Sequence, residues 1–215
     1  MRSRALIVLA LATVAMPLRA QVIDRVLAVV GAEAVTLSDV RAAEVFRFAA
    51  GATPETADVL TYLINRQLML GEVDRYAAPE PEPATLDRRV AQARARFQTQ
   101  ELYEQALART AMTEGRLRAV VAENLRIETY LDQRFGTAAQ PAPDEVQRYY
   151  REHPAEFTRA GRLAPFDEVQ QGLQQKLAAE RRRALITDWL DRLRRRGQVR
   201  IVSQALVTGA ERSST

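Results

Sequence analysis

Few residues in this sequence have side chains that could attack a substrate, transfer protons or hold a metal ion. The chain contains no cysteine, which excludes thiol catalysis, thiolate metal sites and disulfide bonds. His153 is the single histidine. It precedes a proline at the expected end of a helix, where a polar side chain commonly meets solvent, so we interpret it as a structural residue.

Carboxylates are the remaining groups that could do acid–base chemistry or bind a metal. Glu80 and Glu82 lie close together in "PEPEP", but the alternating prolines keep this stretch extended, as in a solvated spacer. Asp167 and Glu168 fall in the expected first turn of a helix, where the helix dipole favours acidic side chains. The sequence has no acidic calcium-binding loop, no G-x-S-x-G motif and no glycine-rich phosphate-binding motif. We therefore predict no cofactor, no metal site and no catalytic residues.

The N-terminal stretch "MRSRALIVLALATVAMPLRAQ" has the layout of a secretory signal peptide. Two arginines precede an apolar run, which is followed by Pro17 and by the small residue Ala20. The apolar run is shorter than the roughly 20 residues of a membrane span. We predict that residues 1–20 are a signal peptide and that the mature protein is periplasmic, with no stable membrane span. Because Leu18 is larger than signal peptidases usually prefer, a retained anchor is the alternative.

Removal of this segment changes the charge of the chain. The whole sequence carries 31 Lys and Arg residues against 27 Asp and Glu residues. Arg2, Arg4 and Arg19 would leave with the signal peptide and no acidic residue would, so the mature balance is 28 against 27. A nearly neutral chain gives no argument for nucleic acid as a partner.

Most of the mature sequence has the periodicity of amphipathic helices, with apolar residues three or four positions apart. Thr36 is the expected cap of the first helix, because Asp39 stands at capping-box spacing; Ser38 is the rival cap. Thr53 and Thr113 are the expected caps of two later helices. The expected helices cover about 36–50, 54–73, 86–97, 101–109, 113–135, 144–153 and 165–196.

Two short β-rich segments flank these helices. Residues 22–36 have the pattern of a hairpin broken at Gly31, and "QVRIV" (198–202) has the pattern of a strand. Because so short a strand is not stable alone, we expect it to pair with the N-terminal hairpin. The predicted fold is mainly α, a multi-helix domain over residues 21–202 with a small β-sheet. Residues 203–215 are predicted to be a flexible tail.

Several segments resemble the SurA-type periplasmic chaperones, which are related to parvulin-like prolyl isomerases. "VIDRVLAVVGAEAVTLSDV" is similar to the start of the mature family members, and "LTYLINRQLML" is similar to their second helix. "MTEGRLRAVVAENLRIETYLDQRF" resembles the next long helix. "EVQRYYREHPAEF" and the stretch from "LAPFDEVQ" to "VRIV" resemble the segments on either side of the family's isomerase domain. The resemblance covers most of residues 22–202 and implies a SurA N-terminal-like fold.

The resemblance also implies that one domain is missing. In the family, an isomerase domain of roughly a hundred residues lies between the "F" that ends the first of these segments and the "PF-x-E-V" of the second, whereas here only "TRAGRLA" (158–164) stands there. Seven residues cannot hold a β-sheet with a proline pocket. We therefore expect the chaperone part of the family without its catalytic domain, and no enzyme.

The expected function is a periplasmic chaperone that binds unfolded or extended segments of secreted or outer-membrane proteins. Helices with wide apolar faces seldom bury all of them, and an exposed apolar patch with a charged rim suits another chain. The candidate client-binding residues are Tyr149, Tyr150, Phe157 and Trp189; the alternative is that they lie in the core. A separate prolyl isomerase could act alongside. The alternative functions are a dedicated assembly subunit that binds one folded partner and, less favoured, a prolyl isomerase.

Overall fold

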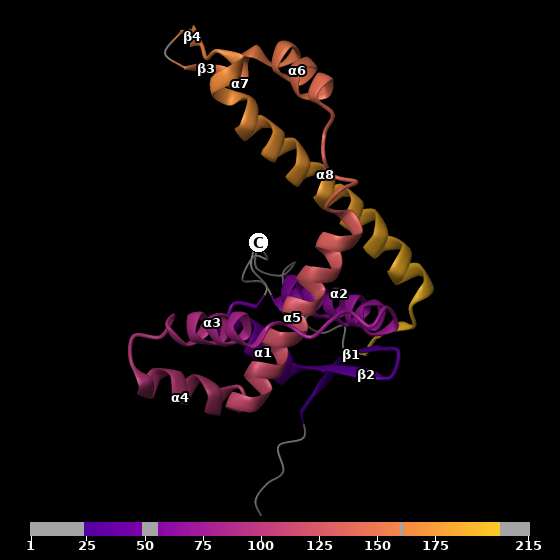
Figure 1. The fold of residues 1–215 in the computed structure, drawn as a ribbon. Coiled ribbons are helices and arrows are strands. Elements are labelled where there is room, and N and C mark those ends of the chain that lie inside the picture. The colour runs from indigo at the N-terminus through magenta and orange to yellow at the C-terminus, as the bar shows by residue number, and fades with distance from the viewer. Residues whose placement is uncertain (1–23, 49–55, 160, 203–215) are drawn as a thin grey trace, which may run out of the picture.

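The computed structural model describes residues 24–48, 56–159 and 161–202. The protein is mainly α-helical with a small antiparallel sheet, as predicted. Figure 1 shows two parts, which we call the body and the arm. The body contains strands β1, β2 and β5 and helices α1 to α4, and the arm contains helices α6 and α7, a short β3–β4 hairpin and the first half of α8. Helices α5 and α8 connect the two parts. The predicted signal peptide and tail lie outside the described residues.

The sheet of the body joins segments from opposite ends of the described chain. Strand β1 (Val26–Val30) lies between β2 (Glu33–Thr36) and β5 (Val199–Ile201), and both pairings are antiparallel. Gly31 makes the β1–β2 turn with a φ of 62°, a conformation that glycine adopts without strain. Ala28 stands opposite Ile201, and the Val202 N–H donates to the Leu27 carbonyl at 2.8 Å. The predicted pairing of the C-terminal strand with the hairpin is confirmed.

Helix α1 (Leu37–Val45) begins where the sequence indicates but ends earlier than expected. Thr36 is the cap: its hydroxyl accepts from the Asp39 N–H, and the Asp39 carboxylate accepts from the Thr36 N–H, which completes a capping box. The rival cap, Ser38, instead donates its N–H to Asp24. The helix ends because Arg47 adopts a left-handed φ of 52°. The expected cap Thr53 lies outside the described residues.

Three helices follow in the body, and a long helix leads away from it. They are α2 (Thr56–Arg75), α3 (Pro83–Arg94), α4 (Gln100–Arg109) and α5 (Glu114–Phe135). Thr113 caps α5 as predicted, with its hydroxyl accepting from the Arg116 N–H. Helix α3 starts at Pro83, earlier than expected, because the Glu82 carboxylate caps it by accepting from the Thr85 N–H at 3.2 Å. Glu82 is extended and exposed as expected, and it is in addition a helix cap.

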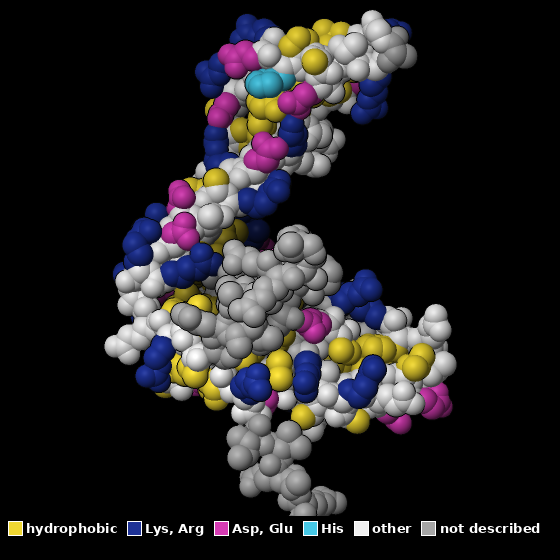
Figure 2. Space-filling view, turned by 180° about the vertical axis from the view of Figure 1, so that it is seen from behind, with side chains coloured by type: hydrophobic (Ala, Val, Ile, Leu, Met, Phe, Trp, Pro, Cys, Tyr) yellow, Lys and Arg dark blue, Asp and Glu magenta, His cyan; other side chains and the backbone are white. Residues whose placement is uncertain are grey.

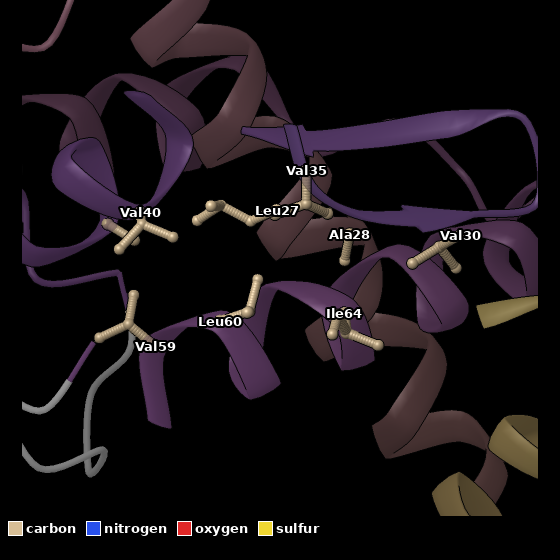
Figure 3. Packing of buried hydrophobic residues seen from close by; sticks show 9 residues of the cluster. Leu27, Ala28, Val30, Val35, Val40, Val59, Leu60 and Ile64 are labelled. Atoms are coloured by element: carbon tan, nitrogen blue, oxygen red, sulfur yellow. The ribbon is translucent and has the colours of Figure 1, made fainter. Parts of the chain in front are cut away.

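The centre of the body is an apolar layer between the sheet and α2. Figure 3 shows Leu27, Ala28 and Val30 of β1 facing Leu60 and Ile64 of α2. A second buried cluster gathers around Phe46, which contacts the rings of Phe48, Phe97 and Tyr103. The regular spacing of apolar residues along α2 and β1 produces this layer, since each element turns one face to the other.

The arm ends in a small hairpin, which lies between the residues expected to flank an isomerase domain. Helices α6 (Pro143–Glu152) and α7 (Pro154–Phe157) lead to β3 (Thr158–Arg159) and β4 (Arg162–Leu163), and the chain returns through α8 (Phe166–Arg196). Val146 of α6 and Leu173 of α8 are buried in the arm. Ion pairs hold α8 to the preceding elements, including one of 2.5 Å from Arg182 to Asp132 of α5.

The end of α8 approaches α2 closely, at Gly197. A Cβ at this position would lie 2.7 Å from the Leu68 side chain and 3.0 Å from the Leu193 carbonyl oxygen. A larger residue at this position would therefore force the Leu68 side chain to move. The close approach brings the chain from α8 directly beside β1, so that β5 can pair with it.

Candidate functional site

A cavity of about 430 Å³ lies between the β1–β2 hairpin and helices α1, α2 and α5. We call it the central cavity. One part of its lining is apolar and another part is charged. The apolar lining includes Val35, Ala42, Phe48, Leu63, Met112 and Val120, and the charged lining includes Arg66, Asp74, Arg116, Glu123 and Arg126. The sequence predicts the helices and strands that form the walls of this cavity. The spacing of apolar residues along them does not predict the cavity itself.

Arg66 is the best-anchored charge of the central cavity. Its side chain is 8% exposed, and its guanidinium donates to the Asn124 side-chain oxygen at 2.7 Å and to the Glu123 carboxylate at 2.5 Å. Arg116 lies 3.8 Å from the same carboxylate. This network holds α2 against α5, because Arg66 belongs to α2 and both acceptors, Glu123 and Asn124, belong to α5. Burial raises the pKa of Tyr62, one helical turn before Arg66.

Arg126 forms the other charged wall of the central cavity. Its guanidinium pairs with Asp74 at 2.9 Å, while its Nε lies 3.6 Å from the Glu80 carboxylate and is buried without a hydrogen bond among the described residues. The cavity thus presents fixed donors and acceptors beside apolar side chains. A peptide segment needs both, since its backbone requires hydrogen-bond partners and its side chains require apolar contacts.

Three of the four predicted client-binding residues lie together at the tip of the arm. Tyr149, Tyr150 and Phe157 are half-buried, and the Phe157 ring lies 5.1 Å from Tyr150 and 6.5 Å from Tyr149 between centroids. The Tyr150 hydroxyl donates to the Ala164 carbonyl at 2.7 Å. Figure 2 shows apolar side chains at this tip, beside His153 and among charged residues. Each ring is therefore packed against at least one neighbouring ring and remains partly exposed.

Charged partners order the tip of the arm. The Tyr149 hydroxyl donates to Glu156 and accepts from Lys176, and Lys176 also pairs with Glu156 at 2.5 Å. The hydrogen bond from Lys176 lowers the pKa of Glu156, and the bond to Glu156 raises the pKa of Lys176. The His153 ring stacks on Tyr149 with 4.0 Å between centroids, which fits its interpretation as a structural residue.

Trp189, unlike the other three predicted client-binding residues, is almost fully buried. Its side chain is 2% exposed and packs against Tyr130 and Phe135 of α5, with ring centroids 5.8 and 5.7 Å apart. The physical reason is that α8 lies across α5 at this point, and the largest side chain of α8 fills the contact between them. The alternative left open by the sequence, a core position, describes this residue correctly.

Large apolar side chains are also exposed at positions that the sequence did not single out. Ile201, the last residue of the edge strand β5, is 49% exposed, and Val202, which follows it, is 55% exposed. Leu163 is exposed in the tip hairpin, and Tyr76 and Leu102 are exposed in the body. The exposure of Ile201 could have been predicted from its place in a strand at the edge of a sheet, because such a strand has one edge and one face in contact with solvent.

The described ranges hold no group of three or more His, Asp or Glu side chains arranged to bind a metal ion. Nor does any helix within them have the length and apolar character needed to cross a membrane.

The fold is similar to a solved structure of a SurA-like chaperone from Campylobacter jejuni, one of the structurally related pair PEB4, a virulence factor, and Cj1289, a periplasmic protein. The alignment has a TM-score of 0.51 and 12% sequence identity, and it covers 83% of this chain and 99% of the other. No protein-family model and no curated protein matches the sequence. The likeness is one of fold, which agrees with the resemblance seen in the sequence.

Proposed function

We propose that this protein is a periplasmic chaperone that binds unfolded or extended segments of secreted or outer-membrane proteins without a catalytic step. The fold similarity to SurA-like chaperones supports this proposal. So does the layout of the N-terminal residues, which is that of a secretory signal peptide.

The observation that carries the proposal is the central cavity. A client segment placed across the cavity would contact Phe48, Leu63 and Met112 through its apolar side chains and the charged wall through its backbone. Tyr149, Tyr150 and Phe157, at the tip of the arm, offer a second and separate apolar contact. Weak binding at each place is expected, because an extended client loses conformational entropy when it is ordered.

We expect the mature protein to suppress the aggregation of several unrelated outer-membrane proteins as they are diluted from urea. Light scattering with increasing amounts of the protein measures this effect, and an equal mass of serum albumin is the control. Suppression for only one of the proteins tested would contradict the proposal and favour the alternative, a subunit dedicated to one partner.

Photo-crosslinking can separate the two proposed contacts. A benzophenone amino acid at Gln67, in the wall of the central cavity, or at Tyr150 should capture an unfolded client. The same group at Gln92, an exposed position of α3, is the matched control. Equal capture from Gln92 would mean that contact is unspecific, and capture from Tyr150 alone would place the client on the arm.

We also propose that the chain lacks prolyl isomerase activity. The short β3–β4 hairpin, in which Thr158 pairs with Leu163, occupies the place of the family's catalytic domain and supports this proposal. The cis–trans rate of a proline-containing peptide, measured with a coupled protease, should therefore stay at its background value when the protein is added. A rate several times above background would contradict it.

A further inference from the structure

Four arginines converge on one surface pocket where the end of α8 meets the end of α5. The pocket has a volume of about 270 Å³ and is lined by Arg134 of α5 and by Trp189, Arg192, Arg195 and Arg196 of α8. We call it the arginine pocket. It is separate from the central cavity, with which it shares no lining residue.

The arginines of this pocket have no acidic partners in the described part of the chain. Three other arginines of α8 are paired: Arg181 with Glu145, Arg182 with Asp132, and Arg194 with Asp191 at 3.2 Å. By contrast, none of the four pocket arginines forms an ion pair with a described carboxylate. Arg134 instead lies over the Trp189 ring, 5.5 Å from its centroid, and donates to the Tyr130 hydroxyl.

The side chains that line the pocket carry hydrogen-bond donors only. A guanidinium has five N–H donors and no acceptor, and an indole has one donor. The Trp189 Nε1 is itself buried without a hydrogen-bond partner among the described residues. Cations at the C-terminal end of a helix gain from its dipole. The four guanidiniums, which come from two helices and are exposed, thus give the pocket positive charge and donors without a matching acceptor.

We propose that the arginine pocket binds a phosphate group. Guanidiniums match the oxygens of phosphate with paired N–H donors, and a group with up to two negative charges and several acceptor oxygens can pair with more than one arginine at once. The phosphate would bridge α5 and α8, because Arg134 comes from the first helix and the other three arginines from the second. This proposal stands on its own observations and does not depend on the chaperone function.

Two sources could supply the phosphate: a soluble phosphate compound or the headgroup of a phospholipid. The pocket opens at the surface, so both can reach it. The chemistry of recognition is the same in the two cases, and the two arms of the experiment below distinguish them.

The first arm measures thermal unfolding of the mature protein in inorganic phosphate, compared with sodium chloride at equal ionic strength. A ligand that binds only the folded state raises the melting temperature as its concentration rises. We expect such a rise for the wild type and at least tenfold weaker phosphate binding for Arg192→Gln/Arg195→Gln. The matched control, Arg148→Gln/Arg151→Gln, removes the same charge from exposed positions of α6 and should behave as the wild type.

The second arm measures co-flotation with vesicles of phosphatidylglycerol and of phosphatidylcholine. Flotation with phosphatidylglycerol that is lost in Arg192→Gln/Arg195→Gln but kept in the control variant would support the proposal with a lipid source. A phosphate-dependent rise in melting temperature without flotation would support it with a soluble source. Equal responses of the pocket variant and the wild type in both arms, or no response of the wild type in either, would overturn the proposal.

Discussion

Replacing Trp189 by alanine is expected to lower the free energy of unfolding by about 3–5 kcal/mol. The indole is almost fully buried and joins α8 to Tyr130 and Phe135 of α5. Alanine would leave a cavity at the contact through which α8 returns from the arm to the body. Urea unfolding followed by circular dichroism measures the change, because Trp189 is the single tryptophan and its fluorescence would be lost.

The control for this variant is Trp189→Phe. Phenylalanine keeps an aromatic ring in the contact and removes the indole N–H, which is buried without a partner. An unpaired buried donor is costly, so its removal offsets part of the lost packing, and we expect a clearly smaller loss than for alanine. If alanine at this position changes stability by less than about 1 kcal/mol, the packing of α8 on α5 described above is wrong.

Replacing Arg66 by methionine is the second change with a large expected effect. Removing one partner of a buried ion pair costs about 3–5 kcal/mol, because the other charge is left without compensation. Glu123 is 28% exposed, so solvent compensates part of the loss, and Arg116 lies 3.8 Å away. We therefore expect about 2–3 kcal/mol, measured by urea unfolding.

A double-mutant cycle tests the cause of this loss. Arg66→Met/Glu123→Leu removes both charges, so the double variant should be less destabilised than the sum of the two single variants. Additive losses would show that Arg66 and Glu123 do not act as a pair. The Asn124 amide, which also accepts from Arg66, remains in every variant and cancels in the comparison.

The parts of the fold that the sequence predicts are those that depend on local signals, such as helix caps and turn glycines. Thr36 with Asp39, Thr113, and Gly31 each determine the chain conformation within a few residues, and each prediction is confirmed. The pairing of residues 199–201 with β1 was also predictable, since so short a strand needs a partner and the described chain offers few. The start of α3 was missed because Glu82 in a proline-rich stretch resembles a spacer as much as a cap.

The candidate site depends on contacts between helices, which one sequence does not specify. Trp189 lies on the apolar face of α8, and only the crossing of α5 decides that this face is covered there. The central cavity is the space that α1, α2 and α5 leave beside Arg66 and Arg126. The periodicity of apolar residues in the sequence does not indicate such a space. Tyr149, Tyr150 and Phe157 are near one another in sequence, so their proximity was predictable, although their exposure was not.

The position of β5 also determines the order in which the protein can fold. As the chain is synthesised, β1 and β2 appear first and can form their hairpin at once. The other edge of β1 then stays unpaired until Val199–Ile201 has crossed, and closing so long a loop makes this step slow. During that interval, β1 presents an open strand edge to other unfolded chains. A product truncated before Val199 would keep that edge permanently and should accumulate as an aggregate.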